Sequence, residues 1–230
     1  MKNLQTVLKL AIEFLTKHGV HRPRLTAETL LAHFLKLKRI ELYMHFDRPL
    51  TEEELVPFRE ALKRAIKHEP IEYIIGEVEF FGVKLKITPA VLIPRQETEI
   101  LIDLVAKQLD GSEKRALDLC TGSGCLAVGL KKALPNLEVV AVDLSKEALD
   151  LARQNSCEIE WLHGDLTGPL QGKFDLVLCN PPYVTSEEYA TLDRSVRDFE
   201  PKMALDSGPT GYEFYERLAK ELPAFLNEGA

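Results

Sequence analysis

The stretch Arg115-Ala-Leu-Asp-Leu-Cys-Thr-Gly-Ser-Gly124 decides the fold of this chain. Its first six residues are a short, mostly apolar run, which predicts a buried strand over residues 115–120. The glycines that follow let the backbone turn tightly into a helix that reaches residue 134. A glycine turn between a strand and a helix is common in itself, so its meaning depends on its surroundings.

Alternating strands and helices continue on both sides of this turn. The patterning predicts helices over 97–109 and 146–154, and strands over 137–142, 159–162 and 174–179. Such alternation is typical of an α/β fold with a doubly wound sheet, in which the strands run parallel and the crossovers are right-handed. Ligands of these sheets bind beyond the carboxyl ends of the strands. The residues that follow each strand are therefore the candidates for a functional site.

Residues 1–68 show a helical periodicity instead. Apolar residues recur at helical spacing until His18, where a following glycine fits a helix C-terminus. A second helix is predicted after Pro23 with Thr26 as its candidate N-cap, and Thr51 opens a third with a glutamate at the capping-box position. Together these helices predict a small all-helical N-terminal domain, of a kind that suits docking to a partner.

A short connecting segment, residues 69–94, separates the helical region from the α/β region. Within it, residues 78–87 alternate between apolar and polar side chains and are interrupted by Gly82. This pattern predicts a β-hairpin. The α/β region then occupies residues 95–230.

Composition excludes several classes of protein. With 45% hydrophobic and 28% charged residues, a chain of 230 residues can bury a core without disulfides or a structural metal. A net charge of −7 argues against a broad grip on a nucleic-acid backbone. The four cysteines lack metal-ligand spacing, so we expect reduced thiols in the cytoplasm and no metal site. No stretch approaches the roughly 20 apolar residues of a membrane span, and the N-terminus lacks the features of a secretory signal.

The ends of the first three predicted strands describe a nucleoside pocket. The glycine turn departs from the dinucleotide pattern G-x-G-x-x-G, because Cys120 and Ala127 stand where glycines are expected. Asp143 ends the second strand, where a carboxylate can accept both ribose hydroxyls, although it also suits a helix N-terminus. Asp165 follows the third strand and can accept from an adenine amine, although it also suits a turn. The absence of a phosphate-binding lysine favours an adenosyl group over ATP.

The candidate cofactor-binding residues follow from these strand ends. They are Asp118, Cys120, Thr121, Gly122, Ser123, Gly124, Asp143, Asp165, Leu166 and Asn180.

The fourth predicted strand ends in the most specific motif of the chain, Asn180-Pro-Pro-Tyr183. The Asn180 side chain offers a carbonyl oxygen, and Pro181 has a fixed φ that aims its own carbonyl rigidly. Two acceptors placed together can hold both hydrogens of an –NH₂ group, and Tyr183 supplies an aromatic face for a planar group. We therefore take Asn180, Pro181 and Tyr183 as candidate catalytic residues, with Pro182 as a further contact to the group that is modified.

This motif resembles the catalytic motif of amino-methyltransferases, which modify adenine, cytosine or glutamine nitrogens. Two further segments narrow the resemblance: Val91-Leu-Ile-Pro-Arg-Gln-Glu-Thr-Glu99 and Phe199-Glu-Pro-Lys-Met-Ala-Leu205, the latter followed by Gly208, Gly211 and Phe214-Tyr215. Together they resemble the HemK/PrmC family, the peptide chain release factor N5-glutamine methyltransferases. The resemblance covers nearly the whole chain.

The resemblance implies a fold and an activity. It implies a Rossmann-like class I methyltransferase sheet that binds S-adenosyl-L-methionine and leaves S-adenosyl-L-homocysteine as product. It also implies methyl transfer to the side-chain amide nitrogen of the glutamine in the Gly-Gly-Gln motif of release factors, with the helical domain docking that partner. The family normally continues beyond the end of this chain, so the last strands of its sheet are expected to be missing. The link over 154–159 is also shorter than the family usually shows.

Three alternatives remain open at this point. A glutamine methyltransferase acting on a ribosomal protein would share every motif. An adenine-N6 nucleic-acid methyltransferase would share the Asn-Pro-Pro-Tyr motif, but it fits poorly with the net charge and the lack of an arginine-rich stretch. A non-catalytic binding module would not need that motif. The roles of Arg95, Glu97 and Glu99 stay open, because acidic residues also suit a helix N-terminus.

Overall fold

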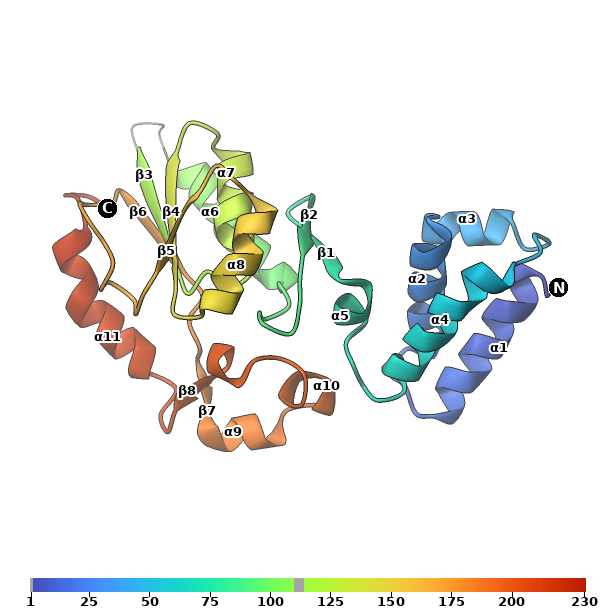
Figure 1. Cartoon of the computed structure of the whole chain (residues 1–230). Coiled ribbons are helices and arrows are strands. Elements are labelled where there is room, and N and C mark those ends of the chain that lie inside the picture. Colours follow the sequence, from blue (N-terminus) through green and yellow to red (C-terminus); the bar gives the residue numbers. More distant parts are fainter. Residues whose placement is uncertain (1, 110–113) are drawn as a thin grey trace. The chain divides into compact units, whose positions relative to one another are not determined.

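The computed structural model describes residues 2–109 and 114–230. The chain divides into two compact units, Met1–Ile75 and Gly76–Ala230 (Figure 1). The division falls just before the predicted hairpin. The hairpin packs with the core of the second unit, since Phe80 and Leu85 are buried there.

The first unit is helical. It consists of α1 (Leu4–Lys17), α2 (Pro23–Leu35), α3 (Arg39–Met44), α4 (Glu52–Ala65) and α5 (Ile71–Ile75). The apolar faces of these helices meet in a leucine-rich core that includes Leu4, Leu15, Leu30 and Leu42. The predicted helical character is confirmed, and α3 and α5 are additional helices too short to show a periodic pattern.

The predicted caps of these helices had different outcomes. Thr51 forms the expected capping box at the start of α4, and α1 ends at His18. The prediction that Thr26 caps α2 was wrong, because the helix already begins at Pro23 and Thr26 is buried inside it. Proline suits the first helical position because it has no N–H group to satisfy there. Arg22 precedes it in the left-handed region, with φ of 50°.

A buried carboxylate, Glu28, joins α2 to α3. Its side chain is 3% exposed and accepts hydrogen bonds from Arg24 Nε at 2.8 Å and Arg39 Nη2 at 2.9 Å, and from the Tyr43 hydroxyl. Burial alone would raise the pKa of Glu28. The hydrogen bonds from Tyr43, Arg24 and Arg39 outweigh burial and hold the pKa below its usual value.

The second unit is built around a parallel sheet. Its strands are β3 (Arg115–Leu119), β4 (Glu138–Asp143), β5 (Glu160–His163) and β6 (Leu176–Cys179). They lie in the order β5-β4-β3-β6, and every neighbouring pair is parallel, which confirms the predicted sheet. The chain moves outward from β3 through β4 to β5 and then returns to place β6 on the other side of β3. The strand order therefore reverses at β3, and a ligand site is expected between the carboxyl ends of β3 and β6.

Helices cover one face of this sheet (Figure 1). They are α6 (Gln96–Gln108), α7 (Cys125–Ala133) and α8 (Lys146–Asn155). The hairpin of β1 (Glu77–Phe80) and β2 (Val83–Lys86) packs on the same side. Glu99 fastens the hairpin to α6, because it accepts from the backbone N of Phe81 at 3.0 Å, whereas Glu97 is exposed.

Gly129 lets α6 and α7 approach closely. A Cβ atom at Gly129 of α7 would lie 2.3 Å from Ile102 Cδ1 of α6, a separation that no real contact allows. The absence of a side chain at Gly129 therefore sets how near α6 can come to α7.

The opposite face of the sheet is covered by the end of the chain. Here α11 (Glu213–Glu221) and η2 (Leu222–Phe225) place Leu218, Leu222 and Phe225 against the buried residues of β3 and β4. The segment between β6 and α11 contains β7 (Val184–Thr185), α9 (Ser186–Thr191), α10 (Arg194–Arg197), η1 (Lys202–Ala204) and β8 (Asp206–Gly208). The β7 and β8 strands pair in parallel, which holds the segment after β8 beside the segment after β6.

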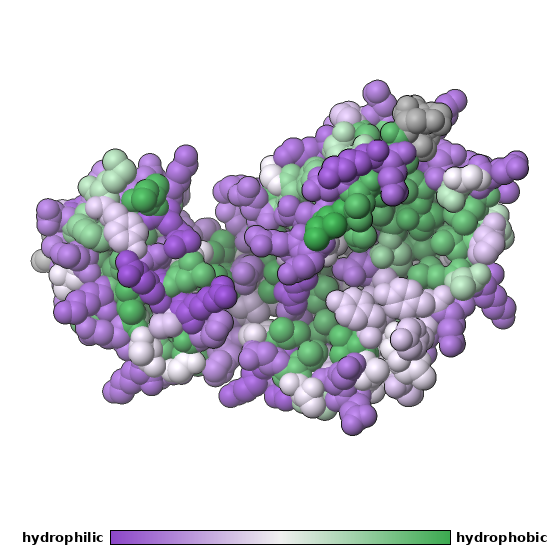
Figure 2. Space-filling model, turned by 180° about the vertical axis from the view of Figure 1, so that it is seen from behind, coloured by the Kyte–Doolittle hydropathy of each residue, from purple (hydrophilic) through white to green (hydrophobic). Residues whose placement is uncertain are grey.

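The surface of the second unit is not uniformly polar. Figure 2 shows hydrophobic side chains gathered on the face seen from behind. Exposed tyrosines are a separate feature of this unit: Tyr183, Tyr212 and Tyr215. None of the helices in residues 2–109 and 114–230 is long and apolar enough to cross a membrane.

Candidate active site

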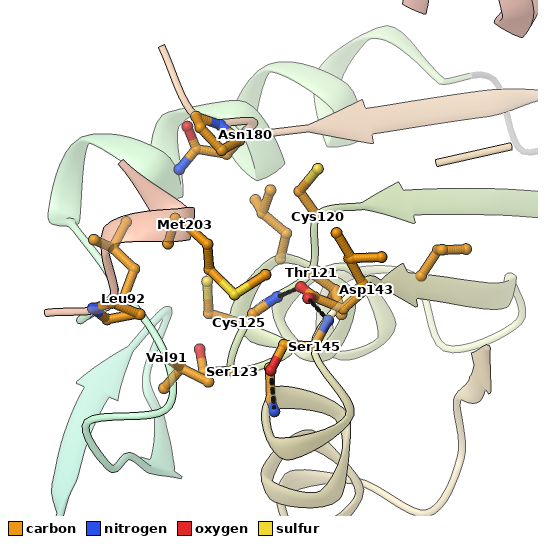
Figure 3. Close-up of a pocket in the computed structure, with 18 of the residues that line it drawn as sticks. Val91, Leu92, Cys120, Thr121, Ser123, Cys125, Asp143, Ser145, Asn180 and Met203 are labelled. Carbon is orange, nitrogen blue, oxygen red and sulfur yellow. Dashed lines mark hydrogen bonds between the residues drawn. The ribbon is translucent and has the colours of Figure 1, made fainter. Parts of the chain in front are cut away.

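A pocket opens at the carboxyl ends of β3, β4, β5 and β6. Its volume is about 970 Å³ when the part open to solvent is included. Residues after each of these strands line it, together with the segments 90–95 and 201–204. Figure 3 shows Asn180 and Asp143 on opposite sides of the pocket, with Met203 reaching in between them. The reversal of strand order at β3 thus creates the pocket where the topology predicts it.

The glycine turn after β3 forms the floor of the pocket. Thr121, Gly122 and Ser123 line it, while Gly124 lies outside the lining as the N-cap of α7. Gly124 has φ of 80°, and a Cβ there would lie 2.5 Å from the Trp161 ring. A side chain at this position would therefore clash even if its backbone conformation were tolerated.

Cys120 adopts the conformation that a glycine would adopt most easily. Its φ is 58°, in the left-handed region, where a residue with a Cβ atom pays about 1–2 kcal/mol. Its side chain lines the pocket beside the turn (Figure 3). The departure from the glycine-rich pattern that the sequence showed is thus a source of local strain.

Asp118 lies beneath the turn and is completely buried. One carboxylate oxygen accepts from Thr121 Oγ1 at 2.5 Å and from the backbone N of Ala127 at 3.1 Å. The other oxygen, Oδ1, has no hydrogen-bond partner among the described residues. Burial raises the pKa of Asp118 to about 7, the nearby charge of Asp143 adds to the rise, and the two hydrogen bonds oppose it. Asp118, which the sequence predicts as a cofactor-binding residue, thus lies outside the lining of the pocket.

Asp143 stands at the end of β4, on the pocket wall. Its two oxygens accept from the backbone N of Gly122 and of Ser145, each at 2.8 Å (Figure 3). Burial raises the pKa of this carboxyl, and these backbone hydrogen bonds oppose the rise. Each oxygen keeps further acceptor capacity, so the fixed carboxylate can still receive two hydroxyl groups.

Asp165 and Leu166 line the pocket after β5. The Asp165 carboxylate accepts two hydrogen bonds from Arg217 of α11, at 3.0 and 3.1 Å. Leu166 is buried and has φ of 46°, a second non-glycine residue of this pocket in the left-handed region. The loop is therefore held in a strained conformation by a partner that the sequence did not reveal.

The Asn-Pro-Pro-Tyr segment forms the other side of the pocket. Asn180 and Pro182 line it, whereas Pro181 is buried outside the lining and the Tyr183 side chain is 59% exposed. The thiol of Cys179, which precedes Asn180, packs with the core. Hydrogen bonding with Cys120 and burial both raise the pKa of the Cys179 thiol, which makes it a poor nucleophile.

Comparison with known proteins places the whole chain in one family. Residues 6–76 match the PrmC N-terminal domain, and residues 95–199 match the methyltransferase small domain. The chain is 40% identical to the release factor glutamine methyltransferase of Chlorobaculum tepidum, over 97% of this chain and 81% of that protein. It is 38% identical to the enzyme of the same name from Geobacter sulfurreducens, over 98% of this chain and 81% of that protein. The chain belongs to the release factor glutamine methyltransferase family.

Solved structures support the fold of this family member. The hMettl16 catalytic domain, determined in complex with MAT2A 3'UTR hairpin 1, superposes with a TM-score of 0.54 at 18% identity. The match covers 86% of this chain and 74% of that one. At this level of identity the likeness concerns the class I methyltransferase fold alone.

Two segments that carried the family resemblance come together at the pocket. Arg95 donates to Glu200 Oε1 at 2.6 Å, and the other oxygen of Glu200 accepts from the backbone N of Ile93 at 3.0 Å. Arg95 lines the pocket, and Glu200 is buried behind it. The segments 91–99 and 199–205 are thereby fixed to each other, which gives Arg95 a place in the site wall that the sequence left open.

Several residues of the wall were not predicted from the sequence. They include Thr98, Ala148, Met203, Ala204 and Phe214. Met203 and Ala204 belong to a short 3-10 segment, and Phe214 to the start of α11, where no strand-end rule applies. Ala148 lies in the first turn of α8, so the helix start after Asp143 was the signal that could have found it.

Proposed function

We propose that this protein transfers a methyl group from S-adenosyl-L-methionine to the side-chain amide nitrogen of a glutamine, the one in the Gly-Gly-Gln motif of peptide chain release factors. The observation that carries the proposal is the position of Asn180 in the same pocket as the glycine turn and Asp143. The names of the relatives, at about 40% identity over nearly the full chain, support the choice of substrate. We place the reaction in the cytoplasm, where release factors act.

The cofactor end of the pocket fits an adenosyl-methionine in charge and shape. Asp143 would hold the ribose hydroxyls, Asp165 and Leu166 the adenine, and the glycine turn from Cys120 to Gly124 the centre of the molecule. The unpartnered oxygen of Asp118 lies beneath that turn, where it would favour the positive charges of the cofactor. Bound there, S-adenosyl-L-methionine supplies an electrophilic methyl group.

The acceptor end must make a weak nucleophile react. The lone pair of an amide nitrogen is delocalised into its carbonyl, so the nitrogen attacks only when it is held and polarised. In our proposal the side-chain oxygen of Asn180 and the carbonyl of Pro181 accept the two amide hydrogens, and Tyr183 lies against the planar amide. The new N–C bond would form as the C–S bond breaks and S-adenosyl-L-homocysteine leaves, and the methylated nitrogen would then release one of its two protons to water. This is catalysis by positioning and electrostatic stabilisation, and it needs no strong base.

The helical unit has an exposed apolar face that suits docking of the substrate protein. On α3, Ile40 and Met44 are 67% and 73% exposed, and Arg39 lies next to them. Large exposed apolar side chains are expected where a partner binds. We propose that the release factor contacts this face. Ile40→Asp should then raise the KM for the release factor and leave the affinity for S-adenosyl-L-homocysteine unchanged.

Transfer of radiolabelled methyl groups tests the proposal. The enzyme is incubated with labelled S-adenosyl-L-methionine and, separately, with a release factor, the same factor lacking the Gly-Gly-Gln glutamine, ribosomal proteins and duplex DNA. We expect label only in the intact release factor. Label in a ribosomal protein or in DNA would replace this substrate with the corresponding alternative.

A variant of the ribose contact separates binding from chemistry. Asp143→Ala should weaken the binding of S-adenosyl-L-homocysteine by roughly tenfold or more, because it removes the acceptor of two hydroxyl groups. Isothermal titration calorimetry measures this directly. An unchanged affinity would show that Asp143 serves only to hold Gly122 and Ser145.

A further inference from the structure

Helix α11 grips the loop after β5 at two points, one on each side of Leu166. Before Leu166, the Asp165 carboxylate accepts a bidentate pair of hydrogen bonds from Arg217, from Nη1 at 3.0 Å and from Nη2 at 3.1 Å. After Leu166, the hydroxyl of Thr167 donates to Glu221 at 2.8 Å. Arg217 also donates to Glu221 at 3.1 Å, one helical turn along α11. The four polar side chains form one continuous network around a single strained residue.

The strained residue is part of the pocket. Leu166 has a left-handed backbone, is buried and lines the same cavity as Asp165. A non-glycine residue stays in this conformation only when its neighbours fix the backbone on both sides. The bonds from α11 to Asp165 and Thr167 do this.

We propose that Arg217 and Glu221 are positioning residues for recognition of the cofactor's adenine. The inference rests on the proposed function, which puts the adenine against Asp165 and Leu166. The guanidinium fork matches a carboxylate and fixes the plane in which Asp165 lies. It uses one acceptor position on each oxygen and leaves the others for the exocyclic amine of the adenine. Glu221 orients Arg217 and, through Thr167, holds Leu166 against the ring.

The same helix also reaches the acceptor end of the pocket. Phe214, in the first turn of α11, lines the cavity. Gly211, two residues before α11, lies against the Asn-Pro-Pro-Tyr segment, since a Cβ atom there would lie 2.9 Å from the carbonyl oxygen of Tyr183. The segment that shapes the acceptor end thus continues directly into the helix that shapes the adenine end.

The size of the expected effect follows from exposure. The side chains of Arg217 and Asp165 are 42% and 54% exposed, so solvent weakens the ion pair itself. Orientation of the acceptor is then the main contribution of Arg217. We expect Arg217→Ala to lower the affinity for S-adenosyl-L-homocysteine about fivefold, and Glu221→Gln about two- to threefold.

Calorimetry with two ligands separates positioning from stability. The ligands are S-adenosyl-L-homocysteine and S-inosyl-L-homocysteine, which carries an oxygen in place of the exocyclic amine. The wild-type protein should prefer the adenine ligand. Arg217→Ala should weaken the adenine ligand and hardly change the inosine ligand, so that the preference falls by the same factor of about five. Lys220→Ala, which removes an exposed cation from the same helix outside the network, should leave the preference unchanged.

Arg217→Lys gives a second, milder test. It keeps the charge and the stem but loses the planar fork, so the preference for adenine should still fall. If Arg217→Ala does not fold, Arg217→Lys and Glu221→Gln decide the question in its place.

Three results would overturn the inference. The first is an unchanged preference in Arg217→Ala or Arg217→Lys with only a lower melting temperature, which would make the network a structural tether. The second is an equal loss of affinity for both ligands, which would show no role in reading the amine. The third is failure of the wild-type protein to bind S-adenosyl-L-homocysteine at all, and only this result would also refute the proposed function.

Discussion

Two buried carboxylates, Glu28 in the helical unit and Asp118 in the second unit, have opposite surroundings. In the helical unit, Glu28 receives hydrogen bonds from two arginines and a tyrosine, and its pKa is held below the usual value. In the second unit, Asp118 has one oxygen without a partner among the described residues, and burial raises its pKa to about 7.

We interpret this difference as a structural role for Glu28 and propose a role beside the cofactor for Asp118. Both oxygens of Glu28 accept hydrogen bonds from side chains of the folded chain, so its charge is neutralised without a ligand. Asp118 is left incompletely bonded directly beneath the pocket, at a cost that a bound cation can offset. Loss of Glu28 should therefore reduce stability, whereas substitutions on the pocket wall of the second unit should mainly alter binding and rate.

The largest effect is expected for Glu28→Ala. It leaves Arg24, Arg39 and Tyr43 without their shared acceptor and should lower the free energy of unfolding of the helical unit by about 3 kcal/mol. Urea titration followed by far-UV circular dichroism measures this loss. Trp161, the only tryptophan of the chain, lies in the second unit, so its fluorescence transition should stay in place.

Glu60→Ala is the matched control in the same unit. Glu60 pairs with Lys63 on the surface, and its loss should cost no more than about 0.5 kcal/mol. Equal effects of the two substitutions would remove the contrast between a buried network and a surface pair.

Asn180→Ala tests the opposite expectation for the second unit. Loss of one of the two proposed acceptors for the amide hydrogens should lower kcat by on the order of 10²-fold or more. The Trp161 fluorescence transition should move little, because Asn180 lies at the pocket wall. Turnover close to that of the wild type would refute the proposed mechanism.

Asp118→Asn addresses the carboxylate of the second unit through pH. The pKa is about 7 in the folded chain and 3.8 is its ordinary value, so the folded chain holds a proton that the unfolded chain releases. Wild-type stability should therefore fall as pH rises from about 4 to 7, and the asparagine variant lacks this loss.

The pH test is a difference between two proteins. Relative to the wild type, Asp118→Asn should gain on the order of 2 kcal/mol between pH 5 and pH 8, at about 1.4 kcal/mol per pKa unit. Urea titrations followed by Trp161 fluorescence at both pH values measure it. Parallel pH profiles would mean that Asp118 is already ionised at pH 5.

The smallest effect concerns backbone strain in both units. Cys120 in the second unit and Lys36 in the first have φ of 58° and 55°. Cys120→Gly and Lys36→Gly should each raise the stability of their own unit by up to about 1 kcal/mol, the strain being partly offset by the greater freedom of glycine when unfolded. Leu166→Gly should do the reverse, because a buried side chain is lost. If Cys120→Gly instead lowers the stability, the packing of the Cys120 side chain stabilises the fold by more than its left-handed backbone conformation destabilises it.

The sequence predicted the sheet because its signals are local. Apolar runs of strand length alternate with helical stretches from residue 97 to residue 179, and each was placed within a few residues of its position. The short helices α3 and α5, and the irregular segment between β6 and α11, were not predicted. They depend on tertiary contacts, since they are too short to show a period.

The site divides in the same way. Residues that follow strands, such as Asp143 and Asn180, were found because parallel strands bring their ends to one edge. The pairs Arg95–Glu200 and Asp165–Arg217 were not found, because their members lie 105 and 52 residues apart. A single sequence does not show which distant charge neutralises which.

Gly129 lies outside the pocket, yet the close approach of α6 and α7 at this glycine affects the position of the pocket wall. Alanine forms helices better than glycine by about 1 kcal/mol, so Gly129→Ala looks like a routine stabilising change of α7. Here the added methyl group would push against Ile102 and drive α6 outward. The first turn of α6 carries Thr98, and Arg95 caps it, both on the pocket wall. A substitution inside α7 that is chosen only to stabilise the helix would therefore also change the width of the pocket.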